Sequence, residues 1–470
     1  MTIPISSFRF FILLRARSSA LLKFTSKALN MKTKLSIIDP NVAGIDIGST
    51  DIFVSATDEG YKKFGTFTED FLQAADYMIK NNINAVAMEA TGVYWIPLKD
   101  VLESKGLKVD LVRAGDANQL PGREKSDGAD CQWIRTLYQR GLLRPCFIPE
   151  ENIRELRAII RLRQDHIEMA ASHILHIQKA FILMNIRLHQ VISQIQGVSG
   201  RKIIEAILNG ERDPKRLLPL CDKQIIKNKK EEVLKSLNGN YRPEYVFMLE
   251  HAYRSWNFYN GLIAECDSTI ESWLKKNNIN KPEIINKKPS KQIRHHKPKI
   301  ENFHEQILKV MEGKDVSKIP GLTDYSAIRL AAEVGTTLKE WKNDKRFVSW
   351  LGLSPKKRDS GKTKRRYKGK QNTVAGQIFK EAAHSLLNSK SIGLGTFGRK
   401  LRARKGPQVA VKATARKIAT LYYNTVTKGS EYVEIGVKRY EENAKKTDFM
   451  RLNRLAKSLG YSLNEIVVHQ

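Results

Sequence analysis

The segment VAGIDIG (residues 42–48), followed by DIFVSATD (residues 51–58), decides the fold of the first part of the chain. Both segments are short and apolar, with several β-branched residues, which is typical of two strands that pair as a hairpin. An acidic residue, Asp46, interrupts the first apolar run. Because side chains alternate between the faces of a strand, we expect Asp46 to lie on the face opposite Ile45 and Ile47.

Strands and helices alternate after this hairpin. The apolar pattern predicts a strand over 63–68, a helix over 69–81, a strand over 85–90, a helix over 93–105 and a strand over 107–114. Strands interleaved with helices are typical of a sheet with helices packed on it. The sequence therefore predicts an α/β domain over residues 40–150.

Three more acidic residues of this domain are candidates for a shared site. Glu89 ends the strand AVAMEA, and Asp127 and Asp130 stand three positions apart at the start of a predicted helix, which places both on one helical face. Carboxylates are the ligands that Mg²⁺ prefers, and two such ions can stabilise the attacking and leaving oxygens of a phosphoryl transfer. Taken alone, any one of these acids is better explained as a surface or capping carboxylate, and Asp127 as the N-cap of that helix.

The charge of the chain indicates a polyanionic partner. Its 470 residues carry a formal net charge of +32, which favours association with nucleic acid. The four cysteines form no CxxC pair, so the sequence predicts neither a disulfide framework nor a structural zinc site and favours the cytoplasm. No membrane anchor is expected. We interpret residues 1–35, including the short apolar run FRFFILL, as a dispensable extension ahead of Met31.

A long helical region follows the α/β domain, over residues 151–276. Apolar residues recur every seventh position from Ile153 to Leu188, which predicts one helix from Asn152 to Val191. A second apolar stripe predicts another helix over residues 245–273. The two helices can form a coiled coil between subunits or a helical hairpin within one chain. Residues 277–302 are rich in Pro and Lys and are interpreted as a basic linker.

A third, mostly α-helical domain is expected over residues 303–428, followed by a charged helical tail over 429–470. Its segment IPGLTDYSAIRLAAEVG resembles a helix-hairpin-helix element, in which Gly321 would allow a DNA phosphate to approach a helix start. A basic loop with one acid comes next. The predicted phosphate contacts in it are Lys356, Lys357, Arg358, Lys362, Lys364, Arg365, Arg366, Lys368 and Lys370. Within this loop, Ser360 alone suggests only a turn.

The motifs GIDIGS around Asp46, MEATGVYW around Glu89 and KSDGAD around Asp127 and Asp130 resemble the DEDD transposases of bacterial insertion sequences, a family that includes the Piv-type DNA invertases. The resemblance covers residues 42 to about 150 and 316–428. It implies that the first domain is similar to the RuvC resolvase, a ribonuclease-H-like fold, and that the four acids hold Mg²⁺ or Mn²⁺.

The same resemblance identifies Ser360, within Asp359-Ser360-Gly361, as a second catalytic residue that attacks DNA. It further implies DNA as substrate, a structured guide RNA encoded by the element, and a homodimer or tetramer associated with the nucleoid. One motif departs from the family pattern: Lys370-Gln371-Asn372 stands where Lys-x-Gly-Asn is usual.

Three other functions are compatible with parts of the sequence. A hydrolytic Holliday-junction resolvase would use the four carboxylates without Ser360. A catalytically inactive nucleic-acid-binding descendant of a transposase would use only the basic residues. An actin-like ATPase would fit GIDIGST, although the second glycine-rich phosphate loop of that fold is missing.

Overall fold

The computed structural model describes the backbone of residues 36–90, 92–113, 126–279, 281–282, 296–355, 357–360, 363–366, 373–389, 393–429 and 431–462. The chain divides into two compact units, Met1–Ile148 and Pro149–Gln470. The predicted N-terminal extension lies outside the described residues. No helix within the described ranges is long and apolar enough to cross a membrane.

The first unit is built on a mixed five-stranded sheet. Its strands lie in the order β3-β2-β1-β4-β5, with β1–β2 and β2–β3 antiparallel and β1–β4 and β4–β5 parallel. The bounds are Val42–Ile47 (β1), Asp51–Ser55 (β2), Lys62–Gly65 (β3), Ala85–Glu89 (β4) and Lys108–Val112 (β5). This arrangement confirms the predicted α/β architecture and is consistent with a ribonuclease-H-like fold.

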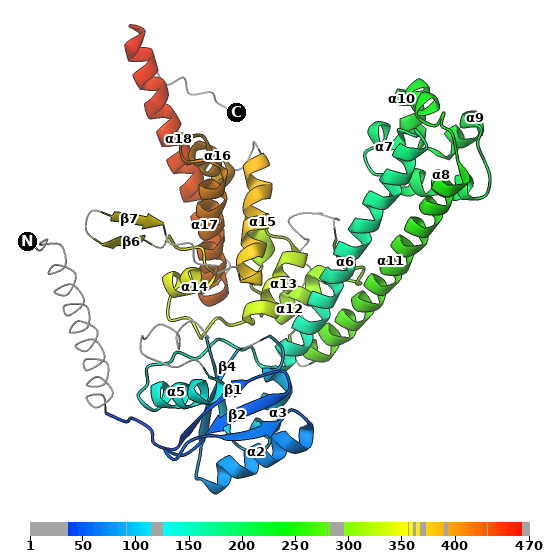
Figure 1. Cartoon of the computed structure of the whole chain (residues 1–470). Helices are drawn as coiled ribbons and strands as arrows, with labels where there is room; N and C mark the ends of the chain where they lie inside the picture. Colours follow the sequence, from blue (N-terminus) through cyan, green and yellow to red (C-terminus); the bar gives the residue numbers. More distant parts are fainter. Residues whose placement is uncertain are drawn as a thin grey trace, which may run out of the picture. The chain divides into compact units, whose positions relative to one another are not determined.

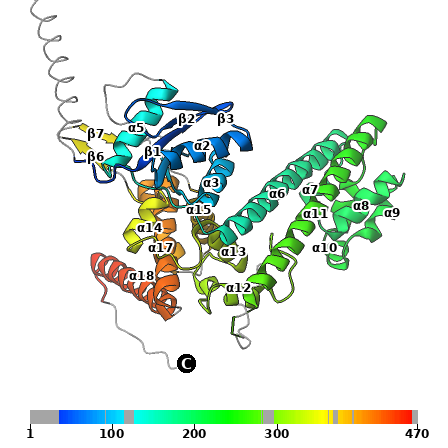
Figure 2. The same cartoon turned by 90° about the horizontal axis from the view of Figure 1, so that it is seen from below.

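Helices cover both faces of this sheet (Figures 1 and 2). Helices α2 (Thr68–Lys80) and α3 (Trp95–Ser104) pack on one face, where Met78 and Leu98 share an apolar core with Ile45. Helix α5 (Asp127–Gln139) packs against β1, β2 and β4 on the other face. The two faces of the sheet therefore differ. The face under α2 and α3 contains the larger apolar core, and the other face is covered by α5.

The second unit begins with a helical hairpin. Helices α6 (Glu151–Leu183) and α11 (Pro243–Asn278) lie side by side along much of their length (Figure 1). They run antiparallel, since Trp273 near the end of α11 donates a hydrogen bond to the carbonyl of Asn152 at the start of α6. A buried ion pair between Arg163 Nε and Asp267 Oδ1, at 2.6 Å, joins the first half of α6 to the second half of α11. The intramolecular alternative for the heptad pattern is thus realised; a coiled coil between subunits stays a prediction.

The first helix of this hairpin ends earlier than predicted. We expected it to reach Val191, but α6 stops at Leu183 and Asn185 takes a left-handed φ of 57°. The N–H of Ile186 donates to the carbonyl of Phe181 at 2.8 Å, and that of Asn185 to Ile182 at 3.0 Å. These two bonds form a Schellman cap, which ends the helix although the apolar spacing continues.

Four short α-helices and one 3₁₀ turn close the tip of the hairpin around a shared apolar core. They are α7 (Leu188–Val191), α8 (Val198–Leu208), α9 (Pro214–Leu217), the 3₁₀ turn Leu218–Leu220 and α10 (Lys223–Ser236).

The rest of the second unit is a helical domain with one small β-hairpin. Its elements are α12 (Phe303–Val310), the 3₁₀ turn Val316–Lys318, α13 (Asp324–Val334), α14 (Asp344–Trp350), β6 (Lys357–Ser360), β7 (Thr363–Arg366), α15 (Val374–Asn388), α16 (Gly393–Lys405), α17 (Pro407–Lys428) and α18 (Glu431–Ser458). Phe347, Phe379 and Tyr422 form its aromatic core. Of the predicted linker, Lys299 donates its N–H to the buried Asp267 at 2.9 Å, so the described end of that segment is anchored to the helical hairpin.

Candidate active site and nucleic-acid interface

Asp46 lies on the sheet face that α5 covers. Ile45 and Ile47 belong to the apolar core of the opposite face, as their alternation with Asp46 predicted. Gly44, two residues before Asp46 and on the same face, lies directly under α5. A Cβ on Gly44 would come within 2.2 Å of the carbonyl oxygen of Cys131 and 2.4 Å of the backbone nitrogen of Arg135. The glycine therefore lets the α5 backbone pack against β1.

Glu89 lies level with Asp46 on the neighbouring strand. The parallel strands β1 and β4 pair Gly44 with Ala87 and Ile45 with Met88, and the next position in this register aligns Asp46 with Glu89. Adjacent strands are about 4.8 Å apart, and residues in register have side chains on the same face. Ala87, two residues before Glu89, shares an apolar cluster with Ile134 of α5. Both carboxylates thus belong to the face under α5.

Helix α5 brings the other two acids to this face. Ser126 is its N-cap and accepts a hydrogen bond from the N–H of Ala129 at 3.3 Å. The capping alternative for Asp127 is therefore wrong, because Ser126 fills that position. Asp127 and Asp130 both stand in the first turn of α5, Asp127 exposed and Asp130 partly buried.

The start of α5 lies toward Asp46 and Glu89. Gly44 lies under Cys131 and Arg135, whereas two residues further along β1 the charge of Asp46 acts on Cys131. Burial and, to a smaller extent, this charge raise the pKa of the Cys131 thiol to about 12. Two strand residues span about 6.6 Å and one helical turn about 5.4 Å. The step from Ala87 to Glu89 thus corresponds to the turn from Ile134 back to Asp130.

The donor chemistry of these four residues suits a hard divalent cation, which takes carboxylate oxygens and water. Within the described ranges, however, no three His, Cys, Asp or Glu side chains stand close enough together to hold a metal ion. The fold therefore places the carboxylates on one face and at matching levels without bringing them into an assembled ligand cluster.

Ser360 is the last residue of β6 in the second unit. The segment predicted as a basic loop is instead a β-hairpin, in which Ser360 pairs with Thr363 and Arg358 pairs with Arg365. These pairs stand two positions apart, so their four residues belong to the same face of the hairpin. Of the other predicted phosphate contacts, Lys357, Lys364 and Arg366 lie on the two strands. Those outside the described residues are Lys356, Lys362, Lys368 and Lys370.

The element that resembles a helix-hairpin-helix has internal packing roles. Gly321 has φ +87°, and a Cβ there would come within 2.9 Å of the carbonyl oxygen of Ala382 in α15. The next helix, α13, is capped by the side chain of Thr323, which accepts a hydrogen bond from the N–H of Ser326. The buried carboxylate of Asp324, the first residue of α13, has its Oδ1 2.8 Å from His304 Nδ1. These contacts explain Gly321 without DNA, so its phosphate contact stays a prediction.

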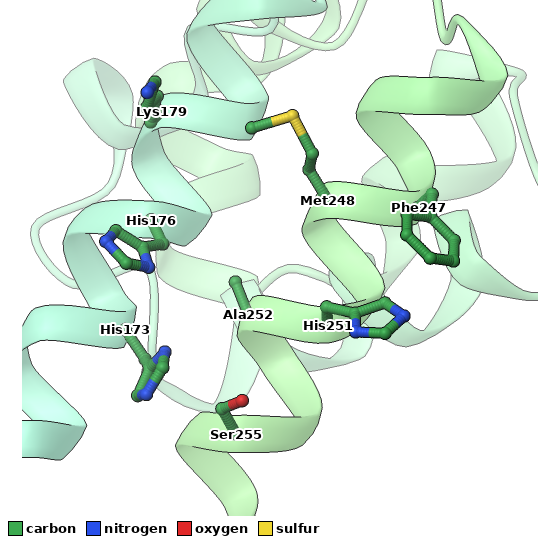
Figure 3. A pocket seen from close by; sticks show the side chains of 8 residues that line it. All are labelled: His173, His176, Lys179, Phe247, Met248, His251, Ala252 and Ser255. Carbon is green, nitrogen blue, oxygen red and sulfur yellow. The ribbon is translucent and has the colours of Figure 1, made fainter.

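A cavity of about 410 Å³ opens between α6 and α11. Figure 3 shows His173, His176 and Lys179 of α6 on one side, and Phe247, Met248 and His251 of α11 on the other. The His251 ring extends away from His173 and His176, so the three imidazoles do not converge on one point. The cavity belongs to the helical hairpin and contains none of the predicted site residues.

Two features of the structure were not predicted from the sequence. The first is the close packing of α5 on Gly44, since the glycines on both sides of Asp46 indicated only that a backbone or a phosphate could approach. The second is a stretch without acids: between Glu381 and Glu431 the chain has no Asp or Glu. Counting acids along the sequence would have revealed it.

Comparisons with known proteins agree with this arrangement. Residues 43–185 match the profile of a transposase family of the DEDD, IS110 type. Residues 314–392 match the profile described as the transposase IS116/IS110/IS902 family. No curated protein matches the chain. The first match contains all four acids and the second contains Ser360.

Proposed function

We propose that the chain cuts and rejoins DNA as the recombinase of an insertion sequence, because two of its stretches match profiles of IS110-type transposases. The observation that supports this most directly is the alignment of Asp46 with Glu89 on neighbouring strands, under a helix whose first turn holds Asp127 and Asp130. Carboxylates held in fixed positions on a sheet are suited to binding metal ions that stabilise the oxygens of a phosphoryl transfer.

We propose that Asp46, Glu89, Asp127 and Asp130 hold Mg²⁺ or Mn²⁺. The ion would supply positive charge beside the phosphoryl oxygens of the DNA. Because Asp127 is exposed and Asp130 only partly buried, small movements of the first turn of α5 would bring their oxygens toward the strand ends.

The role proposed for Ser360 is that of the nucleophile. Its Oγ forms a bond to the phosphorus while the bond from phosphorus to the leaving deoxyribose oxygen breaks. The hydroxyl proton passes to a base, and the leaving oxygen gains a proton. The phosphoserine link conserves the phosphodiester energy, and attack by another DNA hydroxyl releases the serine. Arg358 and Arg365 share the hairpin face with Ser360 and would hold the phosphate.

We propose a dimer or tetramer that forms through the helical region. On α6, large apolar side chains stay exposed at intervals of six or seven residues, on positions that α11 does not cover. They are Leu162, Met169, Leu175 and Ile182, which are 44–64% exposed. Such a stripe fits a helix of another subunit. A structured guide RNA, as the family resemblance implies, belongs to the same proposal.

The decisive experiment incubates purified full-length protein with Mg²⁺ and DNA bearing the ends of the element. Wild type should form a protease-sensitive covalent protein–DNA adduct, and Ser360→Ala should bind DNA but form none. Ser360→Cys is the companion variant, since its thiolate would retain part of the attack. If Ser360→Ala cuts strands at the wild-type rate, the protein is a hydrolytic resolvase and the serine mechanism is wrong.

Mixing two inactive variants tests whether the site is shared between subunits. Asp46→Ala lacks a carboxylate and Ser360→Ala lacks the nucleophile. Recovered recombination in the mixture would support a site composed of two chains. Continued inactivity, with mixed oligomers shown to form, would place both groups of one site in one chain.

A further inference from the structure

The segment without acids, residues 382–430, is strongly basic. It contains ten Lys and Arg residues and no Asp or Glu. It forms the last two turns of α15 and all of α16 and α17, and most of it lies beyond the transposase match, which ends at residue 392. Its basic residues are therefore separate in sequence from those of the β6–β7 hairpin.

Much of this charge is exposed on two helices, α16 and α17, that pack against each other. Helix α17 buries an apolar face that includes Ala415, Ile418 and Tyr422. Lys412 and Arg416 stand on its other side and are exposed. The last turns of α16 expose three more cations. The basic α16–α17 surface is thus defined by Arg402, Arg404, Lys405, Lys412 and Arg416.

Little negative charge balances this surface. Lys400 pairs with Asp448 of α18, but the described residues provide no ion pair for the five cations that define the surface. Lys412 and Arg416 stand four residues apart, a spacing at which like charges on a helix repel each other. Lys380 of α15 lies close enough to Lys412 to interact with its charge. Burial and, after it, the charge of Lys412 lower the pKa of Lys380. A surface that concentrates positive charge from three helices is suited to a polyanion.

The apolar and aromatic side chains narrow the choice of polyanion. A helix that binds a membrane surface needs an exposed apolar face, whereas the apolar face of α17 is buried and Val409 is its one large exposed apolar residue. Unpaired nucleotides bind by stacking on exposed rings. Between residues 393 and 429 no aromatic side chain is among the exposed ones, and Phe397 lies under Lys417, whose Nζ is 4.2 Å from the ring centroid.

We infer that the basic α16–α17 surface binds the phosphate backbone of a nucleic-acid double helix, without reading its sequence. The inference deepens the proposed function and rests on it: a recombinase must hold long duplex arms outside the site where strands are cut. The same phosphate chemistry is offered by duplex DNA and by the paired regions of a structured RNA, so the test includes both.

The test compares three triple variants of the full chain. The surface variant is Arg404→Ala, Lys412→Ala and Arg416→Ala. The control removes the same charge from exposed lysines of α10, by Lys223→Ala, Lys227→Ala and Lys230→Ala. A charge-preserving variant exchanges Lys and Arg at the three surface positions. Binding to a short DNA duplex of unrelated sequence, and to a matching RNA duplex, is measured over a range of salt concentrations.

The surface variant should flatten the slope of log K against log salt by up to ~2.7, about 0.9 for each lost phosphate contact. The control and charge-preserving variants should keep the wild-type slope. Loss on DNA alone assigns the surface to DNA, and equal loss on both duplexes extends it to structured RNA. A wild-type slope in the surface variant on both duplexes, or an equal loss in the control, overturns the inference. If wild type binds duplexes steeply but never cleaves DNA, the proposed function fails while this surface stands.

Discussion

The carboxylates and the serine of the proposed site are held in very different ways. Asp46 and Glu89 stand on adjacent parallel strands of a five-stranded sheet with helices on both faces. Ser360 ends one strand of a two-stranded hairpin. A sheet packed on both faces fixes the positions of its side chains without a bound partner. An isolated two-stranded hairpin, by contrast, is only marginally stable in water.

This difference suggests that the sheet positions the acids, whereas the hairpin depends on bound nucleic acid. The sheet can place acids before any substrate arrives, because its register is determined by burial on both faces. The hairpin carries Lys357, Arg358, Lys364, Arg365 and Arg366 with one acid, so its own charges repel until a phosphate backbone lies among them. We therefore expect substitutions in the sheet to act on the chemistry and the fold, and substitutions in the hairpin to act through nucleic acid.

The largest effect is expected from removing an acid of the sheet. Asp46→Ala and Glu89→Ala should each reduce strand cleavage about 10³-fold or more, because each removes part of the charge stabilisation of the phosphoryl transfer. Asp76→Ala is the control, since it removes an exposed carboxylate from α2 on the opposite face. Cleavage rates on DNA with Mg²⁺, with folding checked by circular dichroism, measure the effect. A folded Asp46→Ala protein that cleaves normally would remove Asp46 from the site.

A smaller effect is expected from disturbing the packing of α5. Gly44→Ala should lower the free energy of unfolding by about 1–3 kcal/mol, since its Cβ meets the α5 backbone and forces the helix away from β1. Cleavage should fall with it, because α5 carries Asp127 and Asp130. Gly261→Ala in α11 is the matched control: nothing lies within 4 Å of its Cβ, and alanine there should add up to about 1 kcal/mol. Urea denaturation compares the two, and equal stabilities would show that α5 does not depend on Gly44.

In the hairpin, the expected effect is confined to binding. Lys364→Ala, Arg365→Ala and Arg366→Ala together should flatten the salt dependence of DNA binding by up to ~2.7 in slope. The free energy of unfolding should stay within about 0.5 kcal/mol of wild type, because we expect these charged side chains to contribute little to packing. Exchanging Lys and Arg at the same positions controls for charge. An unchanged slope would separate the hairpin from nucleic acid, and a large loss of stability would contradict the proposed contrast with the sheet.

The smallest effect concerns the helical hairpin, which belongs to neither region. Burial and then the nearby charge of His176 lower the pKa of His173 below its ordinary 6.5. The folded state therefore binds fewer protons than the unfolded state, and the stability that His173 contributes is present above about pH 6.5 and lost as the pH falls through its folded pKa. His173→Gln should make unfolding less sensitive to pH between 7 and 5. Identical pH profiles would mean that His173 is not responsible.

Local patterns along the chain were enough to predict much of the fold and the candidate acids. Alternation around Asp46 predicted a carboxylate on the face opposite Ile45 and Ile47, and the structure confirms it. The strand–helix alternation and the two long helices also followed from apolar periodicity, which depends on residues close in sequence. The resemblance to a transposase family was recognisable from short motifs for the same reason.

Other features depended on residues distant in sequence. The register that aligns Asp46 with Glu89 and the closeness of Asp46 to Cys131 arise when strands and helices pack, which no single segment encodes. The end of α6 was predicted wrongly because a Schellman cap at Asn185 ended the helix while the apolar spacing continued, and the basic loop proved to be a paired hairpin. The choice between an intramolecular hairpin and a coiled coil between subunits likewise required α11, some hundred residues after α6 begins, since the same apolar stripe can be buried by either partner.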